Sequence, residues 1–175
     1  ALRDLDAGVH FSERFRGERI PTLEEVLEAM GRRVLINIEL TNYATPLDGL
    51  VPAVVDLVRK FGLEKRMLFS SFFPHNLQRA KRLLPRVPCG LLTWAGWPGW
   101  GGRTLGFRRG VYQALHPHLR DVDAGLVRRV QAAGRRIHVW TVNAEADIKR
   151  MIACGVDGIF TDDPALALRI LGRGR

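Results

Sequence analysis

Apolar segments of strand length alternate with amphipathic segments of helix length along most of the chain. The predicted strands cover residues 34–41, 67–72, 89–94, 112–116, 136–142 and 158–161. The predicted helices cover residues 21–30, 46–61, 75–84, 123–133, 144–154 and 164–171. Strands that alternate with helices at this spacing are typical of βα units around a parallel sheet. The glycine-rich interval between the third and fourth strands is predicted to be a loop.

We treat residues 1–175 as one domain, a polar connector and a helix (residues 1–33) followed by six βα units (residues 34–175). A closed (β/α)8 barrel has eight strands and typically about 250 residues. The pattern therefore leaves two topologies open. The chain forms either an open doubly wound sheet or a barrel whose first two units are absent.

The first predicted strand carries the most informative polar residues. Asn37, Glu39 and Thr41 recur there with a period of two, and alternate residues of a strand share a face. The intervening apolar residues would pack against helices, so the polar face points into an interior. An unpaired carboxylate is costly in an interior. Glu39 is therefore expected to have a partner, either a metal ion or an arginine.

Polar residues also stand near the ends of two later strands. His116 ends the fourth strand and His118 lies two residues beyond it, and His138 and Trp140 lie in the fifth. Active sites of α/β enzymes lie at the carboxyl ends of parallel strands, in barrels and open sheets alike. This convergence indicates an enzyme without choosing between the two topologies.

Composition narrows the range of partners and compartments. The chain carries a formal net charge of +9, with 46% hydrophobic and 26% charged residues, and no apolar run reaches the roughly 18 residues of a membrane span. Its basic residues are scattered rather than interleaved with aromatics, so we expect a solvated surface and no nucleic-acid partner. Cys89 and Cys154 match neither a zinc site nor a disulfide framework. We interpret them as reduced core residues of a cytoplasmic protein.

Four segments, in this order, resemble the glycerophosphodiester phosphodiesterase family. They read GERIPTLEEVL (residues 17–27), NIEL (residues 37–40), HVWTVN (residues 138–143) and GVDGIFTDDP (residues 155–164). Ser70-Ser71-Phe72 stands on the strand expected between them. The resemblance extends over essentially the whole chain.

The resemblance implies a fold and an activity. The fold is an α/β TIM-type (β/α)8 barrel, of which six βα units are visible and the first two are missing. The activity is hydrolysis of glycerophosphodiesters to glycerol 3-phosphate and an alcohol, a reaction of lipid and glycerol metabolism. A divalent metal, Ca²⁺ or Mg²⁺, would lie at the carboxyl end of the barrel.

The resemblance also implies roles for individual residues. Glu39 matches the carboxylate that binds the metal, and Trp140 matches the aromatic residue that lines the pocket for the glycerol end. Candidate substrate-binding residues stand with Trp140 at or near strand ends: Thr41, Ser71, Phe72 and His116.

Two departures from the family pattern open an alternative. The family carries its catalytic histidines and its other metal carboxylates on its first two strands, for which residues 1–175 hold no counterpart, and we expect about 60 to 70 further upstream residues. The family also has Lys two residues after the metal-binding Glu, where this chain has Thr41. The alternative is an inactive truncated relative that binds glycerophosphate or acts as an interaction protein. Its open sheet edges would favour a homo-oligomer.

The interval after the third strand is the segment least similar to the family. Trp94, Trp97 and Trp100 recur there with a period of three among Gly and Pro residues. Aromatic and basic residues are favoured at membrane interfaces, so these tryptophans predict peripheral membrane contact. The other interpretation is a loop at the rim of the pocket.

Overall fold

The computed structural model describes residues 2–45, 47–107 and 110–173. Its six strands pair in chain order, and every neighbouring pair is parallel. The strands are β1 (Ile36–Glu39), β2 (Met67–Ser71), β3 (Cys89–Thr93), β4 (Ala114–Pro117), β5 (Arg136–Val139) and β6 (Gly158–Ile159). The prediction of six βα strands in a parallel sheet is confirmed.

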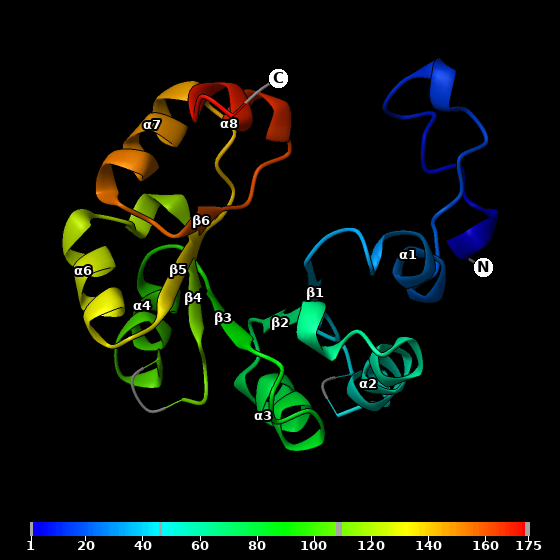
Figure 1. Ribbon diagram of the computed structural model, residues 1–175, viewed down its shortest axis with the longest axis horizontal. Coiled ribbons are helices and arrows are strands. Elements are labelled where there is room, and N and C mark those ends of the chain that lie inside the picture. Colours follow the sequence, from blue (N-terminus) through cyan, green and yellow to red (C-terminus); the bar gives the residue numbers. More distant parts are fainter. Residues whose placement is uncertain (1, 46, 108–109, 174–175) are drawn as a thin grey trace.

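The sheet curls, with helices along its convex side, as in part of a TIM-type barrel (Figure 1). The helices are α1 (Leu23–Met30), α2 (Leu50–Phe61), α3 (Pro74–Leu83), α4 (Trp97–Gly101), α6 (Ala124–Ala132), α7 (Glu145–Cys154) and α8 (Pro164–Ile170). The order of strands decides between the two predicted topologies, because a doubly wound sheet does not keep strict chain order. Among the described residues, no helix is long and apolar enough to cross a membrane.

The core lies between the convex face of the sheet and these helices. Ile38 and Leu40 of the first strand segment are buried there, as the period of two predicts. Buried residues of the later strands continue the same layer, namely Phe69, Leu91, Leu115, Ile137 and Val139. The concave face is thereby left to the polar and aromatic residues that alternate with them.

Local signals account for several element boundaries. Thr22 and Glu25 form a capping box at the start of α1, and Pro74 occupies the first turn of α3. The helix predicted from residue 46, which lies outside the described residues, begins at Leu50 after Gly49 as the N-cap. The Asp48 carboxylate accepts a hydrogen bond from the Leu50 amide at 2.9 Å, which satisfies one free donor of the first turn.

The interval after β3 is helical, which corrects the prediction of a loop. Gly96 makes the turn with a φ of 68°, and α4 follows it, continued by a π-helical stretch over Gly102–Gly106. Glycine and proline have low helix propensity, which is why the sequence suggests a loop. Glycine at position 102 lets this helical segment pack closely against β3, because a Cβ there would lie 2.9 Å from the Cγ2 atom of Thr93.

Two imidazoles and two glycines form one layer across the concave face. A Cβ at Gly90 would lie 2.4 Å from the ring of His116, and one at Gly158 would lie 3.1 Å from the ring of His138. We expect Gly90→Ala to lower the free energy of unfolding by about 2 to 3 kcal/mol, because the new Cβ would overlap the buried His116 ring. Urea unfolding measures this effect. Gly101→Ala is the control, since a Cβ there meets no atom within 4 Å; equal stability of the two variants would contradict the packing argument.

Candidate active site at the carboxyl ends of the strands

Glu39 is the last residue of β1 and pairs in register with Ser70 of β2. Its side chain is exposed, which differs from the buried carboxylate expected from the sequence. The Tyr43 hydroxyl donates a hydrogen bond to Glu39 Oε1 at 3.3 Å. Burial of the phenol and the adjacent Glu39 carboxylate both raise the pKa of Tyr43, so the phenol keeps its proton and remains a donor.

A buried amide pair holds the loop that carries Thr41 and Tyr43. Asn76 of α3 is fully buried, and its Nδ2 donates to Asn42 Oδ1 at 2.6 Å. Asn42 in turn donates to the Asp48 carboxylate at 3.0 Å and to the Thr45 carbonyl at 3.1 Å. Since Asn42 lies between them, this network fixes the backbone from which Thr41 and Tyr43 project. Thr41 itself is exposed beside the end of β1.

Aromatic residues surround the carboxyl ends of the next strands. The Phe72 ring stacks on Trp94 with centroids 4.0 Å apart and meets Trp140 nearly perpendicularly at 5.6 Å. The His118 ring also meets Trp140 at a right angle, at 4.9 Å. Trp140 Nε1 donates to the His116 carbonyl at 2.8 Å, which fixes the indole. The structure thus brings together two predicted substrate-binding residues, Trp140 and Phe72.

His116 and His138 form a hydrogen-bonded pair below Trp140. His138 Nδ1 lies 3.1 Å from His116 Nε2, and His116 is fully buried. Burial, with the neighbouring His138 second, lowers the pKa of His116 to about 3, and burial also lowers the pKa of His138. The pair is neutral at physiological pH. No surface of the His116 ring is exposed for the predicted contact with substrate.

Ser71 lies on the convex side of the sheet, whereas its neighbour Ser70 lies on the same side as Asn37, to which it is hydrogen-bonded. The Ser71 hydroxyl is buried, donates to the Leu40 carbonyl at 2.8 Å and accepts from the Phe73 amide at 3.1 Å. Its bonds connect the ends of β1 and β2. Ser71 therefore supports the site from behind and does not face the predicted substrate pocket.

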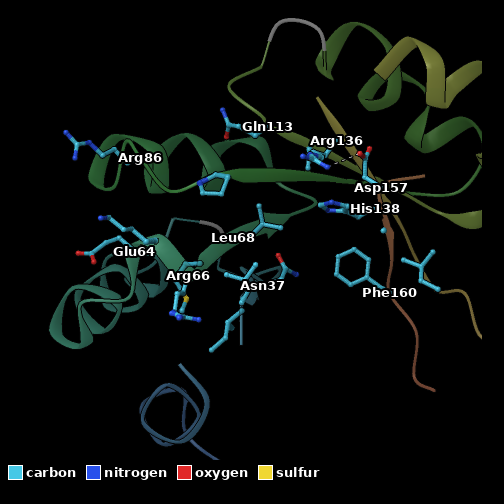
Figure 2. Close-up of a pocket in the computed structure, with 18 residues that line it drawn as sticks. Asn37, Glu64, Arg66, Leu68, Arg86, Gln113, Arg136, His138, Asp157 and Phe160 are labelled. Atoms are coloured by element: carbon cyan, nitrogen blue, oxygen red, sulfur yellow. Dashed lines mark hydrogen bonds and ion pairs between the residues drawn. The ribbon is translucent and has the colours of Figure 1, made fainter. Parts of the chain in front are cut away.

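A cavity of about 650 Å³ lies at the opposite end of the strands. Figure 2 shows the side chains that line it. It is lined by residues at the amino ends of several strands, including Arg66, Gln113, Arg136 and Asp157. We place the candidate site at the carboxyl ends instead, because the loops that follow parallel strands carry the active-site residues in barrels.

The side chains near Glu39 could supply only some of the oxygen ligands that a hard cation needs. Within residues 2–45, 47–107 and 110–173, no three His, Cys, Asp or Glu residues come together as a metal-binding group. Mg²⁺ is commonly bound by one or two carboxylates together with substrate phosphate and water. Glu39 can supply one such carboxylate, with the phosphodiester and water supplying the other oxygens.

Sequence reasoning missed Tyr43 as a member of this site. It stands four residues after Glu39, beyond the end of the strand, so a period of two does not include it. The available signal was an aromatic residue with a hydrogen-bonding group in the short loop that follows a site strand. The roles predicted for Glu39, Thr41 and Trp140 stay predictions.

Comparison with known proteins identifies the family of this chain. The model of the glycerophosphoryl diester phosphodiesterase family matches residues 1–166. A glycerophosphodiester phosphodiesterase of Caldanaerobacter subterraneus is 35% identical over 99% of this chain and 70% of its own length. One from Bacillus altitudinis is 34% identical over 97% of this chain and 69% of its own length.

A solved structure agrees in fold. The phosphodiesterase of Oleispira antarctica, in complex with the product sn-glycerol-3-phosphate, superposes with a TM-score of 0.84 at 27% identity. The match covers 98% of this chain and 69% of that chain. The resemblance seen in the sequence is confirmed: this chain belongs to the glycerophosphoryl diester phosphodiesterase family.

Proposed function

We propose that this chain hydrolyses glycerophosphodiesters to glycerol 3-phosphate and an alcohol, with Glu39 as a ligand of a divalent cation, Ca²⁺ or Mg²⁺. The observation that carries the proposal is the position of Glu39, an exposed carboxylate at the carboxyl end of a parallel strand. Two further findings support it. Relatives at 34% and 35% identity are named glycerophosphodiester phosphodiesterases, and the Oleispira neighbour holds sn-glycerol-3-phosphate.

The chemistry assigns different tasks to the side chains. Hydrolysis joins a water oxygen to phosphorus, breaks the bond from phosphorus to the head-group oxygen and delivers a proton to that oxygen. A divalent cation would neutralise the phosphodiester and the charge that develops on it. Glu39 would hold the cation, Tyr43 orients Glu39 through its hydrogen bond, and Trp140 lines the glycerol end. Thr41 contributes a hydroxyl group without a positive charge.

Metal-dependent turnover tests this proposal. The full chain, stripped of metal with a chelator, is assayed for release of glycerol 3-phosphate from glycerophosphocholine before and after addition of Ca²⁺ or Mg²⁺. We expect no release from the stripped protein and recovery with at least one of the two ions. Absence of release under every metal condition would contradict hydrolysis by this chain.

The alternative is a protein that binds glycerophosphate without hydrolysis. It is favoured by Thr41, which stands where the family has a lysine that reaches the phosphate. Within the described residues, β1 pairs only with β2 and β6 only with β5, so each strand presents a free edge. Such edges favour pairing with a second copy. Calorimetric binding of glycerol 3-phosphate without turnover, together with a dimer in sedimentation, would support this alternative.

We also propose contact with an anionic membrane through the exposed pair Trp97 and Trp100. Their rings lie 6.4 Å apart on α4, with exposed fractions of 86% and 54%. The formal net charge of +9 favours an anionic lipid surface. We expect Trp97→Ala/Trp100→Ala to weaken binding to phosphatidylserine vesicles about tenfold or more in a co-sedimentation assay.

Phe11→Ala is the matched control for this experiment. Phe11 is 84% exposed, but it lies in the N-terminal segment, away from α4 (Figure 1). The control variant should bind vesicles as the parent does. Equal binding by the parent and the double variant would show that Trp97 and Trp100 do not contact the membrane.

A further inference from the structure

We propose that His118 donates a hydrogen bond from its Nε2 atom to a hydroxyl group of the glycerol and so selects glycerophosphodiesters over diesters that lack this hydroxyl. This inference rests on the proposed function and names a specificity-determining residue for the same site. The sequence pattern assigns the contact with substrate to His116 instead, whose ring is fully buried in the structure. The two histidines are two residues apart, and their hydrogen bonds distinguish them.

His118 lies directly beside Trp140 at the carboxyl end of the sheet. The parallel pairing of β4 with β5 continues past the ends of both strands, where His118 and Trp140 form an isolated bridge. Since alternate residues of a strand share a face, this pair forms the next layer above His116 and His138 on the concave side. The rings of the pair meet at 90°, with centroids 4.9 Å apart, and both residues are half-buried. His118 is therefore next to the predicted glycerol end of the pocket.

One nitrogen of the His118 ring is used by the fold and the other is not. Nδ1 accepts a hydrogen bond from the backbone amide of Arg120 at 3.2 Å. A neutral imidazole has one donor and one acceptor nitrogen, so the proton of the neutral His118 ring lies on Nε2. Within the described part of the chain, His118 Nε2 has no hydrogen-bond partner. His118 thus keeps a donor for a ligand, whereas the Nε2 atom of His116 is paired with His138.

The turn that carries His118 is held in place before a ligand arrives. The Leu119 amide donates to the Trp140 carbonyl at 2.8 Å. The Asp121 amide donates to the His118 carbonyl at 3.0 Å. The Asp121 carboxylate forms an ion pair with Arg103 at 3.0 Å, in which the two side chains are only 15% and 10% exposed. A donor that is fixed before binding loses less entropy when it forms its hydrogen bond to the ligand.

The position of His118 favours the glycerol over the phosphodiester as its partner. Our proposal places the cation and the phosphodiester at Glu39, at the end of β1, and in the sheet β2 and β3 separate β1 from β4. Trp140 lines the glycerol end in that proposal, and the His118 ring is in contact with it. A hydroxyl oxygen is an acceptor for an imidazole N–H. A diester without this hydroxyl leaves the donor unpaired in the complex, which weakens binding.

Substrates that lack one glycerol hydroxyl test the inference. The full chain is assayed for choline release from glycerophosphocholine, from 3-hydroxypropyl phosphocholine, which lacks the secondary hydroxyl, and from 2-hydroxypropyl phosphocholine, which lacks the primary one. We expect kcat/KM for at least one of the two analogues to be about fivefold to tenfold lower than for glycerophosphocholine, the usual effect of one hydrogen bond.

Variants at His118 locate the contact. His118→Phe keeps an aromatic ring beside Trp140 but removes the donor, so it should lower kcat/KM for glycerophosphocholine by the same factor and leave the disfavoured analogue unaffected. His118→Gln carries an amide N–H near the position of Nε2 and should restore part of the discrimination. His10→Phe is the control, since it makes the same change at an exposed residue of the N-terminal segment, and it should discriminate as the parent does. If His118→Phe does not fold, His118→Leu removes the same donor and takes its place.

The outcomes separate this inference from the proposed function. Hydrolysis of all three substrates with equal kcat/KM would overturn the inference and leave the proposed function standing. An equal loss for all three substrates in His118→Phe would also overturn it, because it would show only a packing role.

If no substrate is hydrolysed, the proposed function fails, and calorimetric titrations with glycerol 3-phosphate, 3-hydroxypropyl phosphate and 2-hydroxypropyl phosphate decide the inference alone. Discrimination among these phosphates by the parent but not by His118→Phe would support it. Equal or absent binding would overturn it.

Discussion

Glu39→Gln is expected to lower the metal-dependent release of glycerol 3-phosphate by about a hundredfold or more. Glutamine keeps the size of the side chain and an oxygen at its end but removes the charge that attracts a divalent cation. Loss of a metal contribution to a charged transition state is worth several kcal/mol, which corresponds to this factor. Steady-state kinetics over a titration of Ca²⁺ or Mg²⁺ measure both the rate and the apparent metal affinity.

Glu64→Gln is the matched control for this change. Glu64 lies in the 3-10 turn that leads into β2, at the opposite end of the strand, and borders the large cavity (Figure 2). The control makes the same chemical change away from the proposed site, so it should retain parental activity. Because Glu39 is exposed, Glu39→Gln should lose little thermal stability. Parental activity in Glu39→Gln would show that Glu39 does not bind a required metal.

The second large effect concerns stability in acid. His116 has a pKa of about 3 in the folded chain because of its burial, against about 6.5 for an unperturbed histidine. Between these two values the unfolded chain binds a proton that the folded chain does not. Stability therefore falls as pH falls from about 6.5 to about 3. One pKa unit corresponds to 1.36 kcal/mol, so the loss attributable to His116 is on the order of 4 kcal/mol.

Urea unfolding at a series of pH values tests this expectation. His116→Leu removes this titrating group and should make the curve between pH 6.5 and pH 3 less steep, whatever its effect at neutral pH. His116 Nδ1 has no hydrogen-bond partner among the described residues, so a second ring proton would have no acceptor in the fold. An unchanged slope in His116→Leu would rule out this source of acid lability.

The sequence predicted the fold wherever periodicity and end signals agreed. The strand predicted over residues 34–41 had a clear period of two; the observed strand is shorter, Ile36–Glu39, and Ile38 and Leu40 are buried as expected. Helix α1 had a proline, a capping box and an apolar stripe within ten residues. Helix α4 has a proline in its first turn but no capping box, and its glycines mask a segment that packs closely against β3.

The candidate site was less predictable, because it depends on register and on loops. Ser70 and Ser71 are equivalent in the sequence, and only strand pairing shows that Ser70 bonds to Asn37 while Ser71 supports the loop after β1. Tyr43 reaches Glu39 because its loop is held in place by a hydrogen bond from Asn76 of α3 to Asn42. Such a contact between elements leaves no local pattern in a single sequence.

A crystal structure with Ca²⁺ and sn-glycerol 3-phosphate would show where the metal and the product bind. We expect a calcium ion about 2.3 to 2.6 Å from a Glu39 carboxylate oxygen, with the phosphate on the ion and the glycerol against Trp140. The cavity at the amino ends of the strands offers a competing location, since Arg66, Arg86 and Arg136 border it. Product bound there, with no metal at Glu39, would show that Glu39 and Trp140 do not form the active site.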